Sequence, residues 1–204
     1  IFERLLKIYT AHGMRVENLT PNVAGLEAFK NSPLSQYMTH YKGALKNNLS
    51  EDNVAPDVKL PRYRQLADLI RTYGSETFVE VGTWNGGRAI EMSLASFESK
   101  DKVHYIGFDL FEEATEELDK YELNSKPHNT IIAVNNRLQQ FADKMKEQGK
   151  EFSFELHKGD SKETLVNAKE SIAKANFAFI DGGHSEETVI SDYEHLKHCD
   201  VIVF

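Results

Sequence analysis

The sequence predicts an α/β fold in which a doubly wound, mostly parallel sheet follows an N-terminal helical extension. The first observation is that short apolar, β-rich runs alternate with helical patterns from residue 61 onward, which is typical of βαβ units. The second is that the first four runs each end in an acid with a glycine nearby. Parallel strands place such ends along one edge of a sheet, where ligands bind. The expected strands cover residues 77–81, 103–108, 152–157 and 177–180, and a fifth begins near Val201.

The stretch TFVEVGTWNGGRAIEM, residues 77–92, is the one around which the rest of the chain is organised. A strand without breakers ends at Val81, Gly82 opens a turn, and Gly86 with Gly87 closes it. Such a turn presents backbone N–H groups at a helix N-terminus, and the missing Cβ atoms allow a ligand to approach the main chain. The helix that follows is expected to bury a stripe made of Ile90, Leu94 and Phe97.

Helices are expected between the strands, with an extra one after the second strand. The pattern there predicts an acidic helix over residues 112–122 and a longer helix over residues 130–148. A βαβ crossover needs only one helix, so one of the two is an insertion. The acidic run over residues 112–117 is expected to be a solvated helix face, and Ser161 is expected to be the N-cap of the helix after the third strand. The longer helix carries one apolar stripe, made of Ile131, Val134, Leu138, Phe141 and Met145.

Length and composition indicate one domain with an extension. The chain has 204 residues, of which 40% are hydrophobic, enough for a core. We expect residues 1–60 to form a helical extension that acts as a lid or as the contact of a homo-oligomer. We expect residues 61–204 to form the ligand-binding domain, truncated after its fifth strand because Phe204 lies inside the last apolar run.

Charge and cysteine usage exclude several classes of partner. The formal net charge is −8 and there is no basic run, which argues against nucleic acid or an anionic membrane as the main partner. No apolar stretch is long enough for a membrane span. Cys199 is the only cysteine, so no disulfide forms within the chain. A reducing, cytoplasmic location is therefore the expectation.

The acids at the strand ends suggest an adenosine-containing ligand. The first loop reads E-x-G-x-x-x-G, which is neither G-x-G-x-x-G nor a P-loop, so a pyrophosphate is disfavoured. Asp109 ends the second strand, where a carboxylate can accept hydrogen bonds from both ribose hydroxyls. Asp160 and the backbone of Ser161 are placed to read the adenine amino group and a ring nitrogen.

These motifs together resemble those of the class I S-adenosylmethionine-dependent methyltransferases, whose fold is Rossmann-like. More narrowly, the chain is similar to the branch of metal-dependent sugar and macrolide O-methyltransferases and cephalosporin-hydroxylase-like proteins. The resemblance covers residues 61–204. It is carried by the glycine loop, by Asp109, by Gly159-Asp160-Ser161 and by Asp181-Gly182-Gly183-His184.

The resemblance implies a role for each matching residue. Asp109 would hold the ribose of the cofactor, and Asp160 with Ser161 its adenine. Asp181 would lie beneath the methyl group and, in the metal-dependent branch, would be one ligand of a Mg²⁺ ion. Residues at the first loop would hold the methionine end of the cofactor: Glu80, Gly82, Thr83 and Gly86.

The implied reaction is methylation of a small hydroxylated molecule such as a sugar. The sulfonium carbon is already activated, so the protein mainly has to align an acceptor oxygen with it. A neutral His184 is predicted to take the hydroxyl proton, because imidazole titrates near neutrality. A divalent ion on Asp181 would lower the pKa of the acceptor hydroxyl, and hard oxygen ligands favour Mg²⁺.

Two other functions remain open at this stage. One is a nicotinamide-dependent oxidoreductase on a similar sheet, which the lack of a pyrophosphate loop disfavours. The other is a module of the same fold without catalysis, which uses the acidic insertion as a contact surface.

Overall fold

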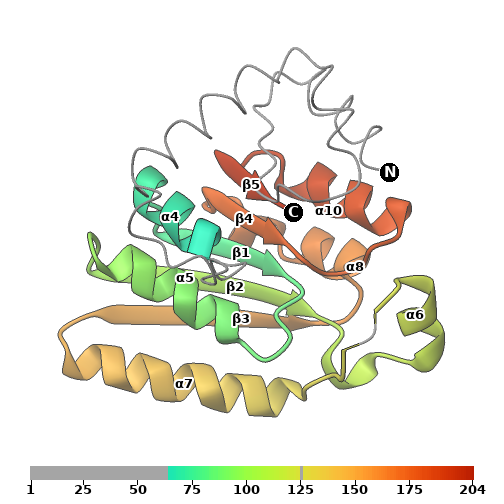
Figure 1. Cartoon of the computed structure of the whole chain (residues 1–204), viewed down its shortest axis with the longest axis horizontal. Coiled ribbons are helices and arrows are strands. Elements are labelled where there is room, and N and C mark those ends of the chain that lie inside the picture. Colours follow the sequence, from blue (N-terminus) through green and yellow to red (C-terminus); the bar gives the residue numbers. More distant parts are fainter. Residues whose placement is uncertain (1–63, 125) are drawn as a thin grey trace, which may run out of the picture. The chain divides into compact units, whose positions relative to one another are not determined.

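The computed structural model describes residues 64–124 and 126–204, and these contain a five-stranded sheet in which all strands are parallel (Figure 1). The predicted fold class is therefore confirmed. The extension predicted over residues 1–60 lies outside the described residues. The strands run in the spatial order β3-β2-β1-β4-β5. Their bounds are β1 Thr77–Val81, β2 Lys102–Asp109, β3 Glu151–Lys158, β4 Phe177–Ile180 and β5 Val201–Val203.

The strand order shows that the sheet is doubly wound. The chain builds outward from β1 to β2 and β3, then returns to the other side of β1 to form β4 and β5. The winding direction reverses between β1 and β4, and ligands bind outside the carboxyl ends of the strands at such a point. Val81 pairs with Phe108 on β2 and with Ile180 on β4, so the carboxyl ends of these three strands lie side by side.

Helices cover both faces of the sheet because the strands alternate apolar side chains to either side. Phe78 and Tyr105 belong to one buried cluster, whereas Val79 and Ile106 belong to the other. The first cluster includes side chains from α4 (Arg64–Tyr73), α5 (Gly87–Phe97) and α7 (Ile131–Glu147). The second includes side chains from α8 (Ser161–Asn167), α9 (Lys169–Ile172) and α10 (Glu186–Leu196).

The apolar stripe predicted for the long helix is confirmed, but the stripe predicted for α5 is wrong at Leu94. In α7, Val134, Leu138, Phe141 and Met145 are buried. In α5, Leu94 is 46% exposed, and small residues such as Ala89 and Ala95 are buried instead. Phe97 is buried as predicted, and Ile90 packs partly buried against the core. Small side chains let α5 pack against α4 as well as against the sheet, so its buried face is wider than the predicted stripe. The buried hydroxyls on this face donate to backbone carbonyls, Ser93 to Ala89 and Ser96 to Ser75.

The acidic helix predicted over residues 112–122 is wrong in extent. The structure has a short 3₁₀ helix, η2 (Phe111–Glu113), and then a separate helix, α6 (Glu116–Tyr121). Thr115 lies between them in an extended conformation and caps α6, because its side chain accepts a hydrogen bond from the Leu118 N–H. The insertion is the segment that begins with η2 and ends before α7. Its helix α6 lies beyond the carboxyl ends of the strands (Figure 1).

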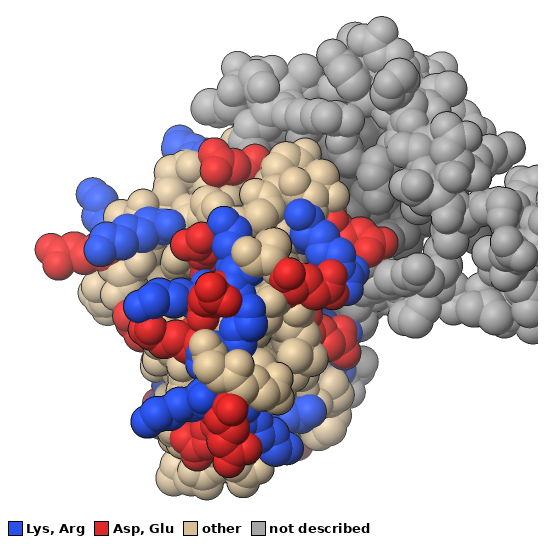
Figure 2. Space-filling view, turned by 90° about the vertical axis from the view of Figure 1, so that its left-hand side faces the viewer, with Lys and Arg blue, Asp and Glu red and all other residues tan. Residues whose placement is uncertain are grey.

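The opposite end of the sheet carries paired charges. Figure 2 shows this side, where basic and acidic side chains are interspersed. Several of them form surface ion pairs with N–O distances of 2.7 Å, such as Lys102 with Glu151 and Lys150 with Asp101. Within the residues that the structure describes, no helix is both long and apolar enough to cross a membrane.

Candidate functional site

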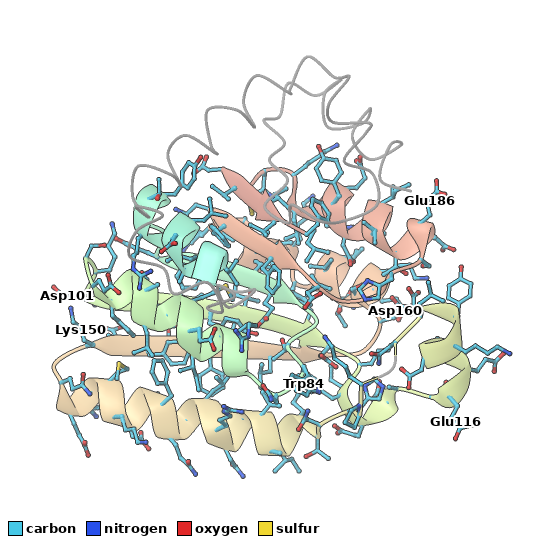
Figure 3. All side chains as sticks on the ribbon, viewed as in Figure 1. Trp84, Asp101, Glu116, Lys150, Asp160 and Glu186 are labelled. Carbon is cyan, nitrogen blue, oxygen red and sulfur yellow. The ribbon has the colours of Figure 1, made fainter. Side chains whose placement is uncertain are left out.

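A cavity of about 130 Å³ lies at the carboxyl edge of the sheet, between the strand ends and the insertion. Figure 3 labels Trp84 and Asp160 at this end, with Glu116 of α6 nearby, and places Asp101 and Lys150 at the other end. The strand ends contribute Val81, Gly82, Trp84, Phe108, Asp109, Leu110, Gly159, Asp160, Ser161, Asp181, Gly182, Gly183 and His184. The insertion contributes Leu118, Asp119, Glu122, Asn124, Lys126 and His128, and α10 contributes Thr188.

Gly82 lies where the ends of β1, β2 and β4 meet, and the backbone there leaves no space for a side chain. Its N–H donates to the Phe108 carbonyl at 2.8 Å, and its φ is +94°. A Cβ at this position would lie 2.3 Å from the carbonyl oxygen of Asp181. Only glycine fits both the backbone angle and the space, so the turn after β1 can lie directly against the end of β4.

Asp109 forms hydrogen bonds to the turn after β1 and to the start of the insertion. Its Oδ2 accepts a hydrogen bond from the Trp84 N–H and its Oδ1 accepts one from the Phe111 N–H, both at 2.7 Å. Trp84 and Phe111 each have a φ of +50°, a region that non-glycine residues rarely occupy. The carboxylate thus stabilises two strained residues, and each of its oxygens keeps acceptor capacity for a ligand.

Glu80 lies behind the cavity wall and is completely buried. The Tyr105 hydroxyl donates to its Oε2 at 2.6 Å, and lies 2.9 Å from the Thr83 hydroxyl. Its Oε1 has no hydrogen-bond partner in the part of the chain that the structure describes. Burial raises the pKa of Glu80 to about 8, and the hydrogen bond from Tyr105 opposes this shift only in part. A cationic ligand group that reached Oε1 would therefore find a carboxyl group without a competing partner.

Glu80→Gln is expected to change how stability depends on pH. The pKa of Glu80 rises from 4.5 to about 8 on folding, so the folded state holds an extra proton between these values. The contribution of Glu80 to the free energy of unfolding is therefore full below pH 4.5 and is lost as pH rises through about 8. Urea unfolding should show the wild type losing on the order of a few kcal/mol more than Glu80→Gln between pH 5 and pH 8.5. Equal losses in both proteins would contradict this account.

The other residues predicted at the first loop are divided between the cavity and the core. Gly82 lines the cavity, whereas Thr83 and Gly86 are buried away from it. Gly86 has a φ of +74°, and a Cβ on it would lie 3.2 Å from Val134 and 3.3 Å from Leu138. Its direct structural role is thus to let α7 pack against the turn.

Asp160 and Ser161 follow β3 and both line the cavity. The predicted N-cap is off by one residue, because Ser161 is the first residue of α8 and Asp160 is the cap. The Asp160 Oδ1 accepts a hydrogen bond from the Lys162 N–H at 2.9 Å. A carboxylate satisfies a free N–H at a helix start better than a hydroxyl does, since it also complements the helix dipole.

Asp181 and His184 follow β4 and also line the cavity. The ammonium of Lys126 lies 4.0 Å from the Asp181 Oδ2, so the insertion brings a positive charge to this carboxylate. Among residues 64–124 and 126–204, no three His, Cys, Asp or Glu side chains are placed to hold one metal ion. A Mg²⁺ ion at Asp181 stays a prediction, since Mg²⁺ is often held by one or two carboxylates together with water.

Glu122 fixes the insertion to the loop after β4. Its Oε2 accepts from the Ser185 N–H at 2.8 Å, and its Oε1 accepts from the hydroxyls of Ser185 and Thr188 at 3.0 and 2.7 Å. Its backbone carbonyl accepts from the His184 N–H at 3.3 Å. Burial raises the pKa of Glu122, but these hydrogen bonds outweigh burial and lower it. Glu122 therefore links the end of α6 to the N-terminus of α10.

The insertion forms a wall of the site, which the sequence did not predict. Six of its residues line the cavity, and all six follow Glu117. The glutamates of the acidic run itself, residues 112–117, are exposed as predicted. The partners of Glu122 lie 63 and 66 residues further along the chain, so no local pattern marks it. The glycine at position 183 reflects this contact only indirectly. A Cβ on it would lie 2.6 Å from the Glu122 Oε2, so a larger residue would collide with the insertion.

Glu122→Ala is expected to release the insertion from α10. The variant loses three hydrogen bonds to a carboxylate, which should lower the free energy of unfolding by about 2 kcal/mol. Hydrogen exchange should then accelerate at the backbone N–H groups of His184 and Ser185. Glu117→Ala removes the same charge from an exposed position of α6 and serves as the control. Similar exchange rates in the two variants would show that Glu122 does not hold the loop.

Comparisons with known proteins give a family match and several structural matches. A family model described as a methyltransferase domain matches residues 79–200, more than half of the chain. Among solved structures, CalS11, a calicheamicin methyltransferase, aligns with a TM-score of 0.46 and 15% identity, over 89% of this chain and 80% of that chain. An O-methyltransferase from Bacillus cereus, solved in complex with S-adenosylhomocysteine, aligns with a TM-score of 0.40 and 14% identity, over 78% of this chain and 60% of that chain. No curated protein matches the chain. Of these findings, only the family match bears on function.

Proposed function

Because the chain belongs to the methyltransferase domain family, we propose that it is an S-adenosylmethionine-dependent methyltransferase that methylates a hydroxyl of a small molecule such as a sugar. The observation that carries the proposal is the convergence of three carboxylates from three strand ends on one cavity, those of Asp109, Asp160 and Asp181. An adenosine with a charged sulfonium tail offers hydroxyls, an amino group and a positive charge, and each of these suits a carboxylate.

The cofactor is proposed to lie along the edge of the sheet. Asp109 accepts the ribose hydroxyls with the acceptor capacity that its two backbone hydrogen bonds leave. Asp160 and the Ser161 backbone contact the adenine. Gly82 allows close approach of the methionine end, and the unpartnered Oε1 of Glu80 is the proposed partner of its amino group. Thr83 and Gly86 do not contact the cofactor in this proposal. Thr83 hydrogen-bonds to Tyr105, and Gly86 lets α7 pack against the turn.

The acceptor is proposed to bind beside Asp181 and His184. The bound cofactor supplies an activated methyl group, so the residues of this chain bind and orient the acceptor oxygen. Asp181 accepts a hydrogen bond from the acceptor hydroxyl, and Lys126 balances its charge. His184 lies in the same loop and contacts the acceptor oxygen; the sequence predicts it as the base for the hydroxyl proton.

Isothermal titration with S-adenosylhomocysteine and with NADH tests the proposal against its alternatives. The proposal predicts binding of S-adenosylhomocysteine, no binding of NADH, and transfer of a labelled methyl group to members of a panel of glycosides and phenols. Binding of NADH alone would favour an oxidoreductase. Binding of S-adenosylhomocysteine without any methyl transfer would favour a non-catalytic module.

A further inference from the structure

Two histidines line the cavity, and they differ in how their rings are held. His184 comes from the loop after β4 and is exposed, and no side-chain hydrogen bond holds its ring within the part of the chain that the structure describes. His128 comes from the insertion. Its Nε2 lies 2.8 Å from the Asp119 Oδ1, 3.0 Å from the Asp119 Oδ2 and 3.2 Å from the Asn124 Nδ2. A histidine held by a carboxylate is the usual arrangement of a base in catalysis.

The Asp119–His128 pair is part of a small polar cluster that faces the cavity. Asn124 donates from Nδ2 to the Asp119 Oδ1 at 2.9 Å, and accepts from the Lys126 N–H at 3.1 Å. Asp119, Asn124, Lys126 and His128 all line the cavity. The hydrogen bonds from Asn124 and His128 lower the pKa of Asp119, so its carboxylate stays charged near neutral pH.

The loop that carries His128 is fixed next to the proposed acceptor position. The Trp84 Nε1–H donates to the Pro127 carbonyl at 2.8 Å, which ties the loop to the turn after β1. The ammonium of Lys126 lies 5.8 Å from the centre of the Trp84 ring and 4.0 Å from the Asp181 Oδ2. His128 thus lines the same cavity as Asp181, two residues along the loop from the lysine that approaches this carboxylate.

We propose that His128, oriented by Asp119, is the general base that takes the proton of the acceptor hydroxyl. The proposal rests on the proposed methyl transfer. In a neutral ring whose Nε2–H donates to Asp119, Nδ1 carries the lone pair. As the acceptor oxygen forms its bond to the methyl carbon, its proton moves to Nδ1. The methyl–sulfur bond breaks and the sulfur keeps the electron pair. The imidazolium formed is stabilised by Asp119 and later loses the proton to water.

The pH profile of turnover separates the two histidines. The acceptor is the compound of the glycoside and phenol panel with the highest turnover, and the variants are His128→Asn, Asp119→Asn and His184→Asn. His128→Asn should lower kcat about 100-fold or more and remove the ionisation of the base from the pH profile of kcat. His184→Asn should keep that ionisation. The opposite pattern would overturn the proposal and leave His184 as the base.

Other charged groups face the same cavity and must be separated from His128. They are Asp109, Asp119, Glu122, Lys126, Asp160 and Asp181. Asp119→Asn should lower kcat without changing KM for the acceptor by more than about twofold, because it changes the ring tautomer and not the cavity shape. A loss that appears only in KM would mean that the pair binds the acceptor without accepting its proton, which would overturn the proposal.

A measurement without any acceptor completes the test. Nitrogen-15 NMR of the histidine rings should find His128 with its proton on Nε2, and Asp119→Asn should abolish this preference. A proton on Nδ1 of His128 in the wild type would exclude it as the base. Failure of the wild type to bind S-adenosylhomocysteine would instead reject the proposed function. All three variants should bind S-adenosylhomocysteine within about twofold of the wild type.

Discussion

Gly82→Ala is expected to abolish binding of S-adenosylhomocysteine and to lower the free energy of unfolding by about 3 kcal/mol or more. A methyl group at this position would lie 2.3 Å from the Asp181 carbonyl oxygen, which belongs to the backbone and cannot turn away. The φ of +94° adds strain for any residue with a Cβ. The end of β1 would be pushed away from the end of β4, and the cavity between them would change shape. Urea unfolding and isothermal titration measure the two effects.

Gly149→Ala is the matched control for this variant. Gly149 also has a positive φ, +74°, but nothing lies within 4 Å of a Cβ built on it. Only the backbone strain remains, so we expect a loss of about 1–2 kcal/mol and unchanged affinity for S-adenosylhomocysteine. If the two alanine variants lost the same stability and both kept their affinity, the contact between β1 and β4 would not be what shapes the site.

Asp109→Ala is expected to have the second largest effect. The variant loses both hydrogen bonds that hold Trp84 and Phe111 at positive φ, which should lower the free energy of unfolding by about 2–4 kcal/mol. It also removes the proposed partner of the ribose, so affinity for S-adenosylhomocysteine should fall at least about 100-fold. Trp84 fluorescence reports the turn directly, because Trp84 is the only tryptophan of the chain.

Asp101→Ala makes the same substitution next to the other end of β2. Asp101 forms an exposed ion pair with Lys150, and such pairs contribute little to stability. We expect its stability to stay within about 1 kcal/mol of the wild type and its ligand affinity to stay unchanged. If Asp109→Ala kept the stability and the ligand affinity of Asp101→Ala, Asp109 would neither hold the two loops nor bind the ribose.

Much of the fold could be predicted because its signals are local. The apolar β-rich runs of the strands and the stripe on α7 each lie within one element, so the sequence is enough to place them. The buried face of α5 could not be placed in this way, because α5 packs against α4 as well as against the sheet. The family predicted from the strand-end motifs is confirmed by the match over residues 79–200.

The sequence predicts the site residues that lie at or just after the end of a strand. Asp109, Asp160 and Asp181 line the cavity because each follows an apolar run in a parallel sheet. Glu122 and His128 escaped prediction, since an insertion can lie anywhere near its strand ends until its tertiary contacts are known. Glu122 finds its partners on α10, and His128 finds Asp119, only in the folded chain.

A crystal structure with S-adenosylhomocysteine tests the central claim most directly. It should show the ligand in the cavity at the carboxyl edge, with the ribose hydroxyls within hydrogen-bond distance of Asp109 and the adenine against Asp160 and Ser161. A ligand bound at another place on the domain, with this cavity filled by water alone, would contradict the account.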